Sequence, residues 1–400
     1  MNKKKEIVPK FRFPEFQRDG IDFVHGNKLF KSITNKNHNS DLPILAITQD
    51  QGAVPRDQIE YNVTVTDKSL SNYKVVEVGD FIISLRSFQG GIEYSRFKGI
   101  CSPAYIILRK REENISELYY KYFFKTWRYI QSLNRNLEGI RDGKMISYSQ
   151  FSSVKVPYPR SFKEQQKIAD CLSSIDELID AENRKLKALE KYKKGLMQKL
   201  FPAEGKTLPE WRFPEFRGKS EWRIKPLGKI CTNYDSRRIP ITEKDRVKGE
   251  IPYIGASGVI DYINDFIFDE DLLCVSEDGA NLVARTYPIA FSISGKTWVN
   301  NHAHVLKFSH KYTQDIVESY LNMINLQDFL TGMAQPKLNR AKLDIIPIPL
   351  PEEEEQQKIA NCLSEVDKII TEQSNKVEQL KAHKKGLMQG LFPSLEEADV

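Results

Sequence analysis

Two short segments of this sequence carry residue types that bind nucleotides or metals in proteins. AFSISGKT (290–297) fits a loose phosphate-loop pattern, with alanine in place of the first glycine. A phosphate loop needs a helix that begins at its Lys-Ser/Thr pair, whereas Trp298 and Val299 continue the alternation of a strand. His302 and His304 could share a metal ion, but no further Cys or His cluster accompanies them. The sequence therefore favours neither a nucleotide site nor a metal site, and no catalytic constellation stands out.

Polar and basic side chains in turns suggest a different chemistry, the recognition of nucleic acid. Arg, Lys, Asn and Gln side chains hydrogen-bond to base edges, while Ser, Tyr and Lys side chains bind phosphates. The alternative for any single residue is a solvated surface side chain, so the prediction depends on clustering. The candidates in the first half of the chain are Arg86, Ser87, Gln89, Tyr94, Arg96, Lys98, Arg141, Lys144, Ser147, Tyr148 and Gln150. The candidates in the second half are Asp278, Asn281, Arg285, Lys296, Trp298, Asn300, Asn301, His302, Lys337, Asn339 and Arg340.

The elements that must position these residues are organised by a long internal repeat. The segment 164–202 (EQQKIADCLSSID…KKGLMQKLFP) aligns without a gap to 355–393, with 22 identities in 39 positions. RFPEF occurs at 12–16 and at 212–216, and VPYP at 156–159 has a counterpart in IPLP at 348–351. The two blocks between these shared segments, roughly 17–160 and 217–350, show no such identity. This pattern indicates one common scaffold that carries two different recognition blocks.

The repeated segments have the heptad spacing of long helices. Apolar residues recur at alternating steps of three and four over about five heptads, and polar residues interrupt the seam at Glu182, Lys193, Gln373 and Lys384. Each helix of about 36 residues would be about 54 Å long. Both segments are acidic at their beginnings and basic at their ends, which favours antiparallel packing. We therefore expect an antiparallel coiled coil within one chain. A dimerisation zipper is the alternative, and the polar interruptions either fix the register or face a partner's helices.

The two blocks combine strand and helix patterns. VVEVGDFIIS (75–84) has strand character and ISELYYKYFFKTWRYIQSL (115–133) is helical in period. The second block repeats this pattern: 269–286 and 289–308 read as strand–turn–strand segments, and 314–330 matches the helix. The sequence thus predicts two α+β domains of a common fold.

The composition agrees with an ordinary globular protein of two or three domains. The 400 residues carry 60 basic and 54 acidic side chains, a net charge of +6 that permits a polyanionic partner without requiring one. The five cysteines are far apart and form no CxxC motif, so we expect neither a disulfide framework nor a zinc site. The start has basic residues without an apolar core, and no apolar run approaches a membrane span. We expect a cytoplasmic protein.

Two unlike blocks, each closed by a P-x-P element and followed by EQQKIA…KKGLMQ.LFP, resemble the specificity subunit of type I restriction–modification systems over essentially the whole chain. The resemblance implies an α+β fold in which two target-recognition domains are held apart by two conserved helices packed as an antiparallel coiled coil. It implies a non-catalytic subunit that reads a split double-stranded DNA sequence, with one domain per half-site. The implied partners are two methyltransferase subunits and two motor-nuclease subunits, and S-adenosylmethionine, ATP and Mg²⁺ would belong to those partners. QPKLNRAKL (335–343) resembles the closing segment of a recognition domain in that family, whereas GKMISYSQF departs from it.

The expected organisation follows from these boundaries. We predict a first recognition domain (1–163), a central helix (164–201), a second recognition domain (202–354), a distal helix (355–392) and a tail (393–400). Two recognition domains that enter major grooves one turn of DNA apart need a spacer of at least about 34 Å, which such helices could provide. The alternative is a coiled-coil scaffold with two protein- or glycan-binding domains. A self-contained methyltransferase is disfavoured, because no cofactor motif is present.

Overall fold

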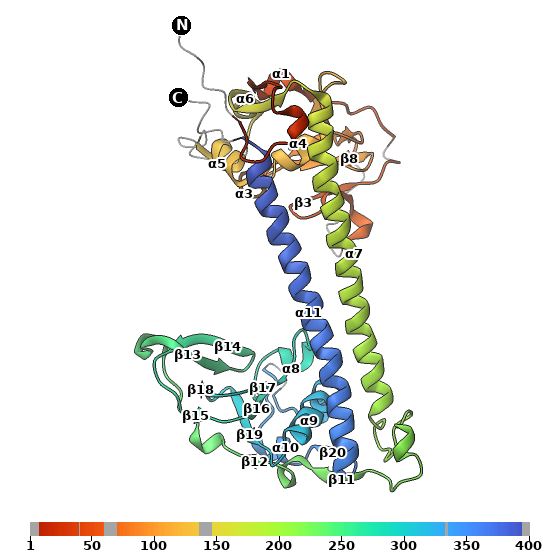
Figure 1. Ribbon diagram of the computed structural model, residues 1–400, viewed down its shortest axis with the longest axis vertical. Coiled ribbons are helices and arrows are strands. Elements are labelled where there is room, and N and C mark those ends of the chain that lie inside the picture. Colours follow the sequence, from red (N-terminus) through yellow and green to blue (C-terminus); the bar gives the residue numbers. More distant parts are fainter. Residues whose placement is uncertain (1–7, 40, 60–69, 136–145, 333–334, 394–400) are drawn as a thin grey trace. The chain divides into compact units, whose positions relative to one another are not determined.

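The computed structural model describes residues 8–39, 41–59, 70–135, 146–332 and 335–393 (Figure 1). The chain forms two compact units: unit 1 comprises residues 1–182 and 376–400, and unit 2 comprises residues 183–375. There are two 39-residue helices, α7 (Phe162–Leu200) and α11 (Glu353–Leu391). One part of each helix belongs to unit 1 and the other part belongs to unit 2. Each unit therefore consists of one sequence block together with a segment from both long helices.

The block in unit 1 is an α+β domain. A four-stranded sheet has the order β2-β9-β6-β7, and three two-stranded sheets pair β1 with β10, β3 with β4, and β5 with β8. The strands are β1 (Ile21–His25), β2 (Phe30–Ile33), β3 (Leu45–Thr48), β4 (Gly52–Pro55), β5 (Lys74–Val76), β6 (Phe81–Ile83), β7 (Glu93–Tyr94), β8 (Gly99–Cys101), β9 (Ile106–Lys110) and β10 (Lys155–Pro159). The helices are α1 (Gly26–Leu29), α3 (Ser87–Gly90), α4 (Glu117–Phe123), α5 (Trp127–Arg135) and α6 (Tyr148–Ser153).

The block in unit 2 is also an α+β domain. It contains two four-stranded sheets, of order β12-β19-β16-β17 and β14-β13-β18-β15. The strands are β11 (Arg223–Pro226), β12 (Thr232–Asn233), β13 (Lys248–Gly255), β14 (Gly258–Ile263), β15 (Phe268–Asp269), β16 (Leu272–Ser276), β17 (Ala290–Ile293), β18 (Lys296–Val299), β19 (Ala303–Lys307) and β20 (Pro347–Leu350). The helices are α8 (Asn281–Ala284), α9 (Lys311–Met323) and α10 (Arg340–Asp344). The prediction of two α+β domains is confirmed.

The short P-x-P echoes are strands that close each block. In unit 1, β1 pairs antiparallel with β10, from Ile21 opposite Pro159 to His25 opposite Lys155. In unit 2, β11 pairs with β20 in the same manner. Because each pair joins the start of a block to the residues just before a long helix, it ties the block to that helix.

Antiparallel pairing of the long helices is confirmed within each unit. In unit 1, Lys384 Nζ lies 2.5 Å from a carboxylate oxygen of Asp176, and Lys376 Nζ lies 2.5 Å from Glu182. From Asp176 to Glu182 the residue numbers rise along α7, whereas their partners on α11 fall from Lys384 to Lys376. The two helices therefore run antiparallel. In unit 2, Lys193 makes the matching 2.5 Å contact with Asp367.

The polar interruptions of the heptad pattern therefore have a structural role. Glu182, Lys193 and Lys384 take part in the ion pairs between the helices, and Gln373 is buried. Pairs of opposite charge at fixed positions set the register of two helices.

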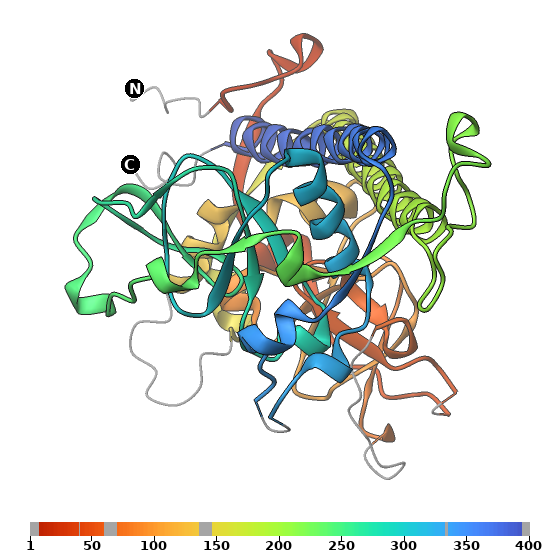
Figure 2. The same cartoon turned by 90° about the horizontal axis from the view of Figure 1, so that it is seen from below.

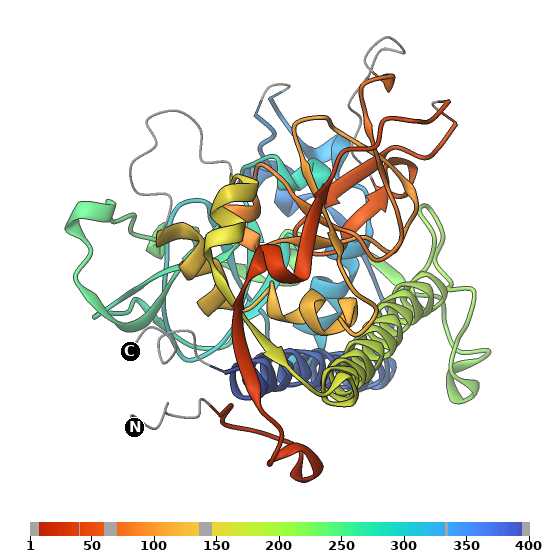
Figure 3. The same cartoon turned by 90° about the horizontal axis from the view of Figure 1, so that it is seen from above.

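Each core combines a sheet, a helix of the sequence block and both long helices. In unit 1, aromatic residues of α4 pack with Ile168 and Leu172 of α7 and with Leu391 and Phe392 at the end of α11 (Figure 3). In unit 2, residues of α9 pack with Leu200 of α7 and with α11 (Figure 2). Burying one side chain of this size contributes about 1.5–3 kcal/mol, so the helix ends are bound firmly to the domains.

The RFPEF echo forms a second duplicated contact. Arg12 Nε lies 2.7 Å from Glu164 at the start of α7, and both side chains are almost completely buried. Arg212 makes the equivalent pair with Glu355 at the start of α11, again at 2.7 Å. Around each pair, the glutamate of the echo (Glu15 or Glu215) forms an ion pair with a helix lysine. The two RFPEF segments thus clasp the N-terminal ends of the long helices.

Among the described residues, no helix is both long enough and apolar enough to span a membrane.

Candidate nucleic-acid interface

Three loops of unit 2 meet at one end of its sheets. The loop after β16 donates from Glu277 N to the carbonyl of His302, in the turn between β18 and β19, at 2.9 Å. The segment that precedes α10 donates from Leu338 N to the carbonyl of Glu277 at 2.8 Å. Gly279 N donates to the carbonyl of Pro336 at 3.2 Å. Backbone hydrogen bonds therefore bring together three regions that are far apart in the sequence.

The side chains at this junction include several of the predicted DNA-contacting residues. His302 Nδ1 lies 2.8 Å from Asp278, and Lys337 Nζ lies 3.3 Å from Glu277. His302 and Lys337 are each about half exposed, at 52% and 51%. Asn301 and Arg340 are also exposed. Donors and acceptors of this kind on one solvent-facing edge are suited to the reading of base edges.

Other predicted residues of unit 2 have their polar atoms engaged inside the domain. Arg285 donates to the carbonyls of Leu282, Leu321 and Ile324, at 3.0–3.1 Å. Asn281 accepts from Thr286 N and Tyr287 N and donates to the carbonyl of Tyr287. These contacts give both residues a role in folding the loop after β16.

Trp298, Asn300, Asn339 and Lys296 also have contacts within unit 2. Trp298 Nε1 donates to the carbonyl of Ile239 at 2.6 Å, and Asn300 Oδ1 accepts from His302 N at 2.8 Å. Asn339 caps α10 by accepting from Lys342 N at 3.0 Å. The Lys296 ammonium is exposed and lies over the Phe266 ring. Polar atoms of the first three residues are thus engaged within unit 2, while Lys296 remains accessible.

In unit 1 the loops after β6 and β7 carry a different set of exposed side chains. Arg86 and Gln89 are exposed after β6, and Gln49 Nε2 of the turn between β3 and β4 donates to the carbonyl of Arg86 at 3.4 Å. Arg96 and Lys98 are exposed beyond β7, where Lys98 Nζ lies 3.1 Å from Glu77. The structure thus places four predicted residues and one further polar side chain on the loops around β6 and β7.

Other predicted residues of unit 1 have contacts that stabilise the fold. Ser87 is buried and its Oγ accepts from Ser84 N at 2.9 Å. Ser147 and Gln150 form a capping box at the start of α6, and the Tyr148 hydroxyl donates to the carbonyl of Phe30.

Tyr94 packs against Phe81 in the core, and burial raises the pKa of its hydroxyl. Arg141 and Lys144 lie outside the described residues.

Sequence reasoning missed three features of the loops in the two units. They are Gln49 and its turn in unit 1, the β13–β14 turn in unit 2, and Arg238. Ser276 Oγ donates to the carbonyl of Ala256 in the β13–β14 turn at 2.5 Å, which ties that turn to β16. Arg238 lies 2.8 Å from Glu277 and donates to the carbonyl of Ala303. Turn sequences such as TQDQG (48–52) and GASG (255–258) are the signals that could have indicated these loops.

The two histidines have separate roles. His304 is buried, its Nδ1 lies 2.6 Å from Asp235, and its Nε2 lies 2.7 Å from the carbonyl of Leu338. Burial would raise the pKa of Asp235, but the hydrogen bond and charge of His304 outweigh it and leave that pKa below its usual value. His302 faces solvent. Among the described residues, no three His, Cys, Asp or Glu side chains are grouped to hold a metal ion.

Comparisons with known proteins agree with this architecture. The sequence profile described as "Type I restriction modification DNA specificity domain" matches residues 19–191 and again residues 219–381. The chain therefore belongs to the type I restriction–modification DNA specificity family, as the resemblance predicted.

Individual relatives resemble the chain to different extents. It is 33% identical over 153 residues to a putative type I restriction enzyme specificity subunit of Haemophilus influenzae, a match that covers 38% of this chain and 39% of that protein. It is 25% identical over 355 residues to the MjaVIII specificity subunit of Methanocaldococcus jannaschii, which covers 82% of this chain and 80% of that protein.

A solved structure supports the fold over nearly the whole chain. The type I restriction–modification S subunit of M. genitalium superposes with a TM-score of 0.59 at 15% identity, covering 97% of this chain and 99% of that chain.

Proposed function

We propose that this chain is the sequence-specific DNA-binding subunit of a type I restriction–modification complex and that it reads a bipartite target, with one recognition domain for each half-site. The observation that carries this proposal is that each unit exposes polar side chains on loops beside its four-stranded sheets, and that the two sets of side chains differ. Unit 1 exposes Arg86, Gln89 and Arg96, whereas unit 2 exposes Asn301, His302 and Lys337. Two different sets of donors and acceptors would recognise two different base sequences.

The chain would supply recognition and assembly, and partner subunits would supply catalysis. The proposed partners are two methyltransferase subunits, which bring S-adenosylmethionine, and two motor-nuclease subunits, which use ATP and Mg²⁺. The duplicated helices support this proposal, because a repeated scaffold offers equivalent surfaces to two copies of one partner.

Co-expression of the chain with the methyltransferase subunit of its host, followed by mapping of methylated adenines, tests this function. We expect one split target sequence. Replacement of residues 17–160 by the block of another family member should change only one half of it. A change in both halves would contradict the assignment of one domain per half-site.

A scaffold that binds protein or glycan is the alternative function. The two are separated by titrating the purified chain with duplex DNA at several salt concentrations, since binding through phosphate contacts weakens steeply as salt rises. Absence of DNA binding at low salt, both alone and with the methyltransferase, would favour the scaffold.

A further inference from the structure

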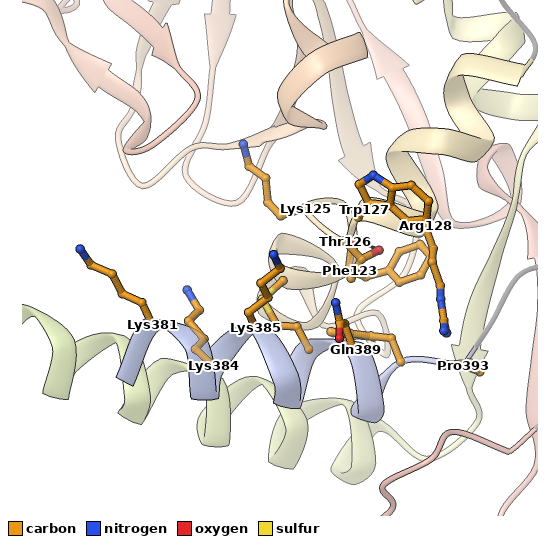
Figure 4. Close-up of a pocket in the computed structure, with 12 residues that line it drawn as sticks. Phe123, Lys125, Thr126, Trp127, Arg128, Lys381, Lys384, Lys385, Gln389 and Pro393 are labelled. Carbon is orange, nitrogen blue, oxygen red and sulfur yellow. Dashed lines mark hydrogen bonds between the residues drawn. The ribbon is translucent and has the colours of Figure 1, made fainter. Parts of the chain in front are cut away.

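Exposed apolar side chains occur in both units, but their surroundings differ. In unit 1, Trp127 at the start of α5 is 68% exposed and lines a groove of about 360 Å³ beside α11. Figure 4 shows this side chain together with the lysines of α11. Among the described residues that line this groove, none belongs to the loops after β6 and β7 that carry the exposed candidates for base contact. Trp127 is therefore separate from that set.

In unit 2, an exposed apolar side chain lies beside the loops that carry such candidates. Ile260 of β14 is 48% exposed. The turn that precedes β14 is fixed to the end of β16, because Ser276 Oγ donates to the carbonyl of Ala256 at 2.5 Å. Asn300 N, in the turn between β18 and β19, donates to the carbonyl of Ile254 in β13 at 3.0 Å. The hairpin of β13 and β14 is thus held against both of these loops.

A β-bulge sets the position of this side chain. Tyr253 of β13 pairs with Asp261 of β14, whereas the next residue, Ile254, pairs with Val259. Ile260 is therefore the extra residue between two paired positions of β14. Bulges change the direction of a side chain and are common next to functional sites. The irregular register thus takes Ile260 out of the regular alternation of its strand.

The side chain of Ile260 lies over the opposite strand, next to Asn300. A Cβ added at Gly255 of β13 would lie 3.1 Å from Cδ1 and Cγ2 of Ile260 and 3.5 Å from Asn300 Nδ2. Glycine at position 255 therefore leaves room for the isoleucine, since it lets another group approach the backbone closely. Asn300 Oδ1 accepts from His302 N at 2.8 Å. The exposed isoleucine thus adjoins the polar residues of this edge.

The chemistry of the major groove indicates what such a side chain would contact. The base pairs present hydrogen-bond donors and acceptors there, and thymine adds an apolar group, the methyl at C5. A contact between this methyl and an isoleucine side chain removes apolar surface of both partners from water. Single exposed apolar residues are common on protein surfaces, so the argument depends on the position of Ile260 beside the polar residues and on the bulge that places it there.

We propose that Ile260 recognises a thymine in the half-site of unit 2, by contact of its side chain with the 5-methyl group. The inference rests on the proposed function, in which this unit binds one half of a split DNA target. It adds the identity of one base in that half and the side chain that selects it. Gly255 is a positioning residue, because it acts only through the space that it leaves for Ile260.

The test uses the full chain co-expressed with the methyltransferase subunit of its host. Methylation mapping gives the target, and exchange of residues 17–160 identifies by exclusion the half that unit 2 binds. Competition binding then compares duplexes in which one thymine of that half, on either strand, is replaced by deoxyuridine, which lacks only the methyl group. One replacement should weaken binding of the wild-type complex about three- to tenfold, the loss expected for one buried methyl contact.

Variants of the hairpin assign this loss to one side chain. Ile260→Ala should bind the thymine and deoxyuridine duplexes equally, because removal of either partner of one contact has the same effect as removal of both. Gly255→Ala keeps the isoleucine but displaces it, and should reduce the discrimination. Val247→Ala removes an exposed apolar side chain at the other end of the hairpin and should keep the full discrimination.

The wild-type measurement does not depend on the folding of any variant. Equal binding of every deoxyuridine duplex by the wild-type complex would overturn the proposal, and so would an Ile260→Ala complex that still prefers thymine. Either result leaves the proposed function intact, provided that the mapping gives one split target. A wild-type complex that methylates no split target overturns the proposed function as well.

Discussion

Lys384 Nζ of α11 lies 2.5 Å from a carboxylate oxygen of Asp176 of α7. Lys193 and Asp367 occupy the matching positions in the other copies of the repeat and make the same contact at the same distance. One ion pair of the repeat is thus used twice, with the roles of the two helices exchanged. A single duplicated sequence has supplied both sides of each interface.

The Asp176 contact predicts a pH dependence of stability. Burial would raise the pKa of Asp176, but hydrogen bonds from Lys384 and Tyr122 outweigh it, and the pKa lies below its usual value. A carboxyl whose pKa is lowered by folding stabilises the folded state above its unfolded pKa, and this contribution is lost as pH falls through the folded value. Asp176→Asn should lower the free energy of unfolding by about 1 kcal/mol at pH 7.

Denaturant unfolding at pH 7 and near pH 3 measures this effect. The difference between wild type and Asp176→Asn should shrink at the lower pH. Glu177→Gln removes the same charge from an exposed neighbouring position and should change stability by less than about 0.5 kcal/mol. An equal loss at both pH values would mean that the carboxylate charge does not stabilise the helix pair.

The two buried ion pairs of the RFPEF segments should be far more sensitive to substitution than the exposed ion pairs. Arg12→Met leaves Glu164 buried without its partner, and Arg212→Met does the same to Glu355. Removal of one member of a buried pair costs about 3–5 kcal/mol. Hydrogen exchange should show Arg12→Met loosening unit 1 and Arg212→Met loosening unit 2. Lys219→Ala breaks an exposed pair with Glu354 and serves as the control, with an expected cost below about 1 kcal/mol.

DNA recognition should separate by unit. Arg86→Ala should weaken recognition of one half-site and Lys337→Ala that of the other, each by about 1–3 kcal/mol if the side chain contacts a base. Competition binding with duplexes altered in one half at a time measures this effect. Arg285→Ala is the informative comparison, because its guanidinium bonds to three carbonyls and its loss should lower the thermal midpoint. An Arg86 variant with unchanged site preference would remove that residue from the interface.

The proposal that the long helices set the spacing of the two half-sites can be tested by insertion. Seven residues added after Glu182 and another seven after Asn375 preserve the heptad pattern and lengthen both helices by about 10 Å. At about 3.4 Å per base pair, the unread spacer in the DNA target should grow by about three base pairs. Methylation mapping reads the new spacer directly. A target of unchanged spacing would show that another part of the complex determines the distance.

The two long helices could be predicted from the sequence because both copies of the repeat show the same heptad spacing and the same separation of charge. Heptad spacing located the helices, and the separation of acidic from basic residues gave their antiparallel direction. The RFPEF echo was visible, but its role was not, since a buried pair such as Arg12 with Glu164 joins residues 152 positions apart.

The interface was less accessible to sequence reasoning. In the sequence, Arg285 and His302 are both polar residues near expected turns, so the same argument predicts both as DNA contacts. Only the folded chain shows that Arg285 is held by backbone carbonyls while His302 faces solvent. Gln49 was not predicted because it lies in the turn between β3 and β4. The residue it contacts, Arg86, follows β6 and is distant in the sequence.

The backbone hydrogen bond from Phe11 N to the carbonyl of Gly390, at 2.8 Å, has a counterpart between Trp211 N and Lys199, at 2.9 Å. In the second case one uninterrupted polypeptide supplies both groups, and in the first they come from opposite ends of the chain. In unit 1 this contact is therefore made between two segments that no nearby stretch of backbone connects. A gene rearranged to begin near residue 206, with the present ends joined by a short linker, should encode a protein of the same form.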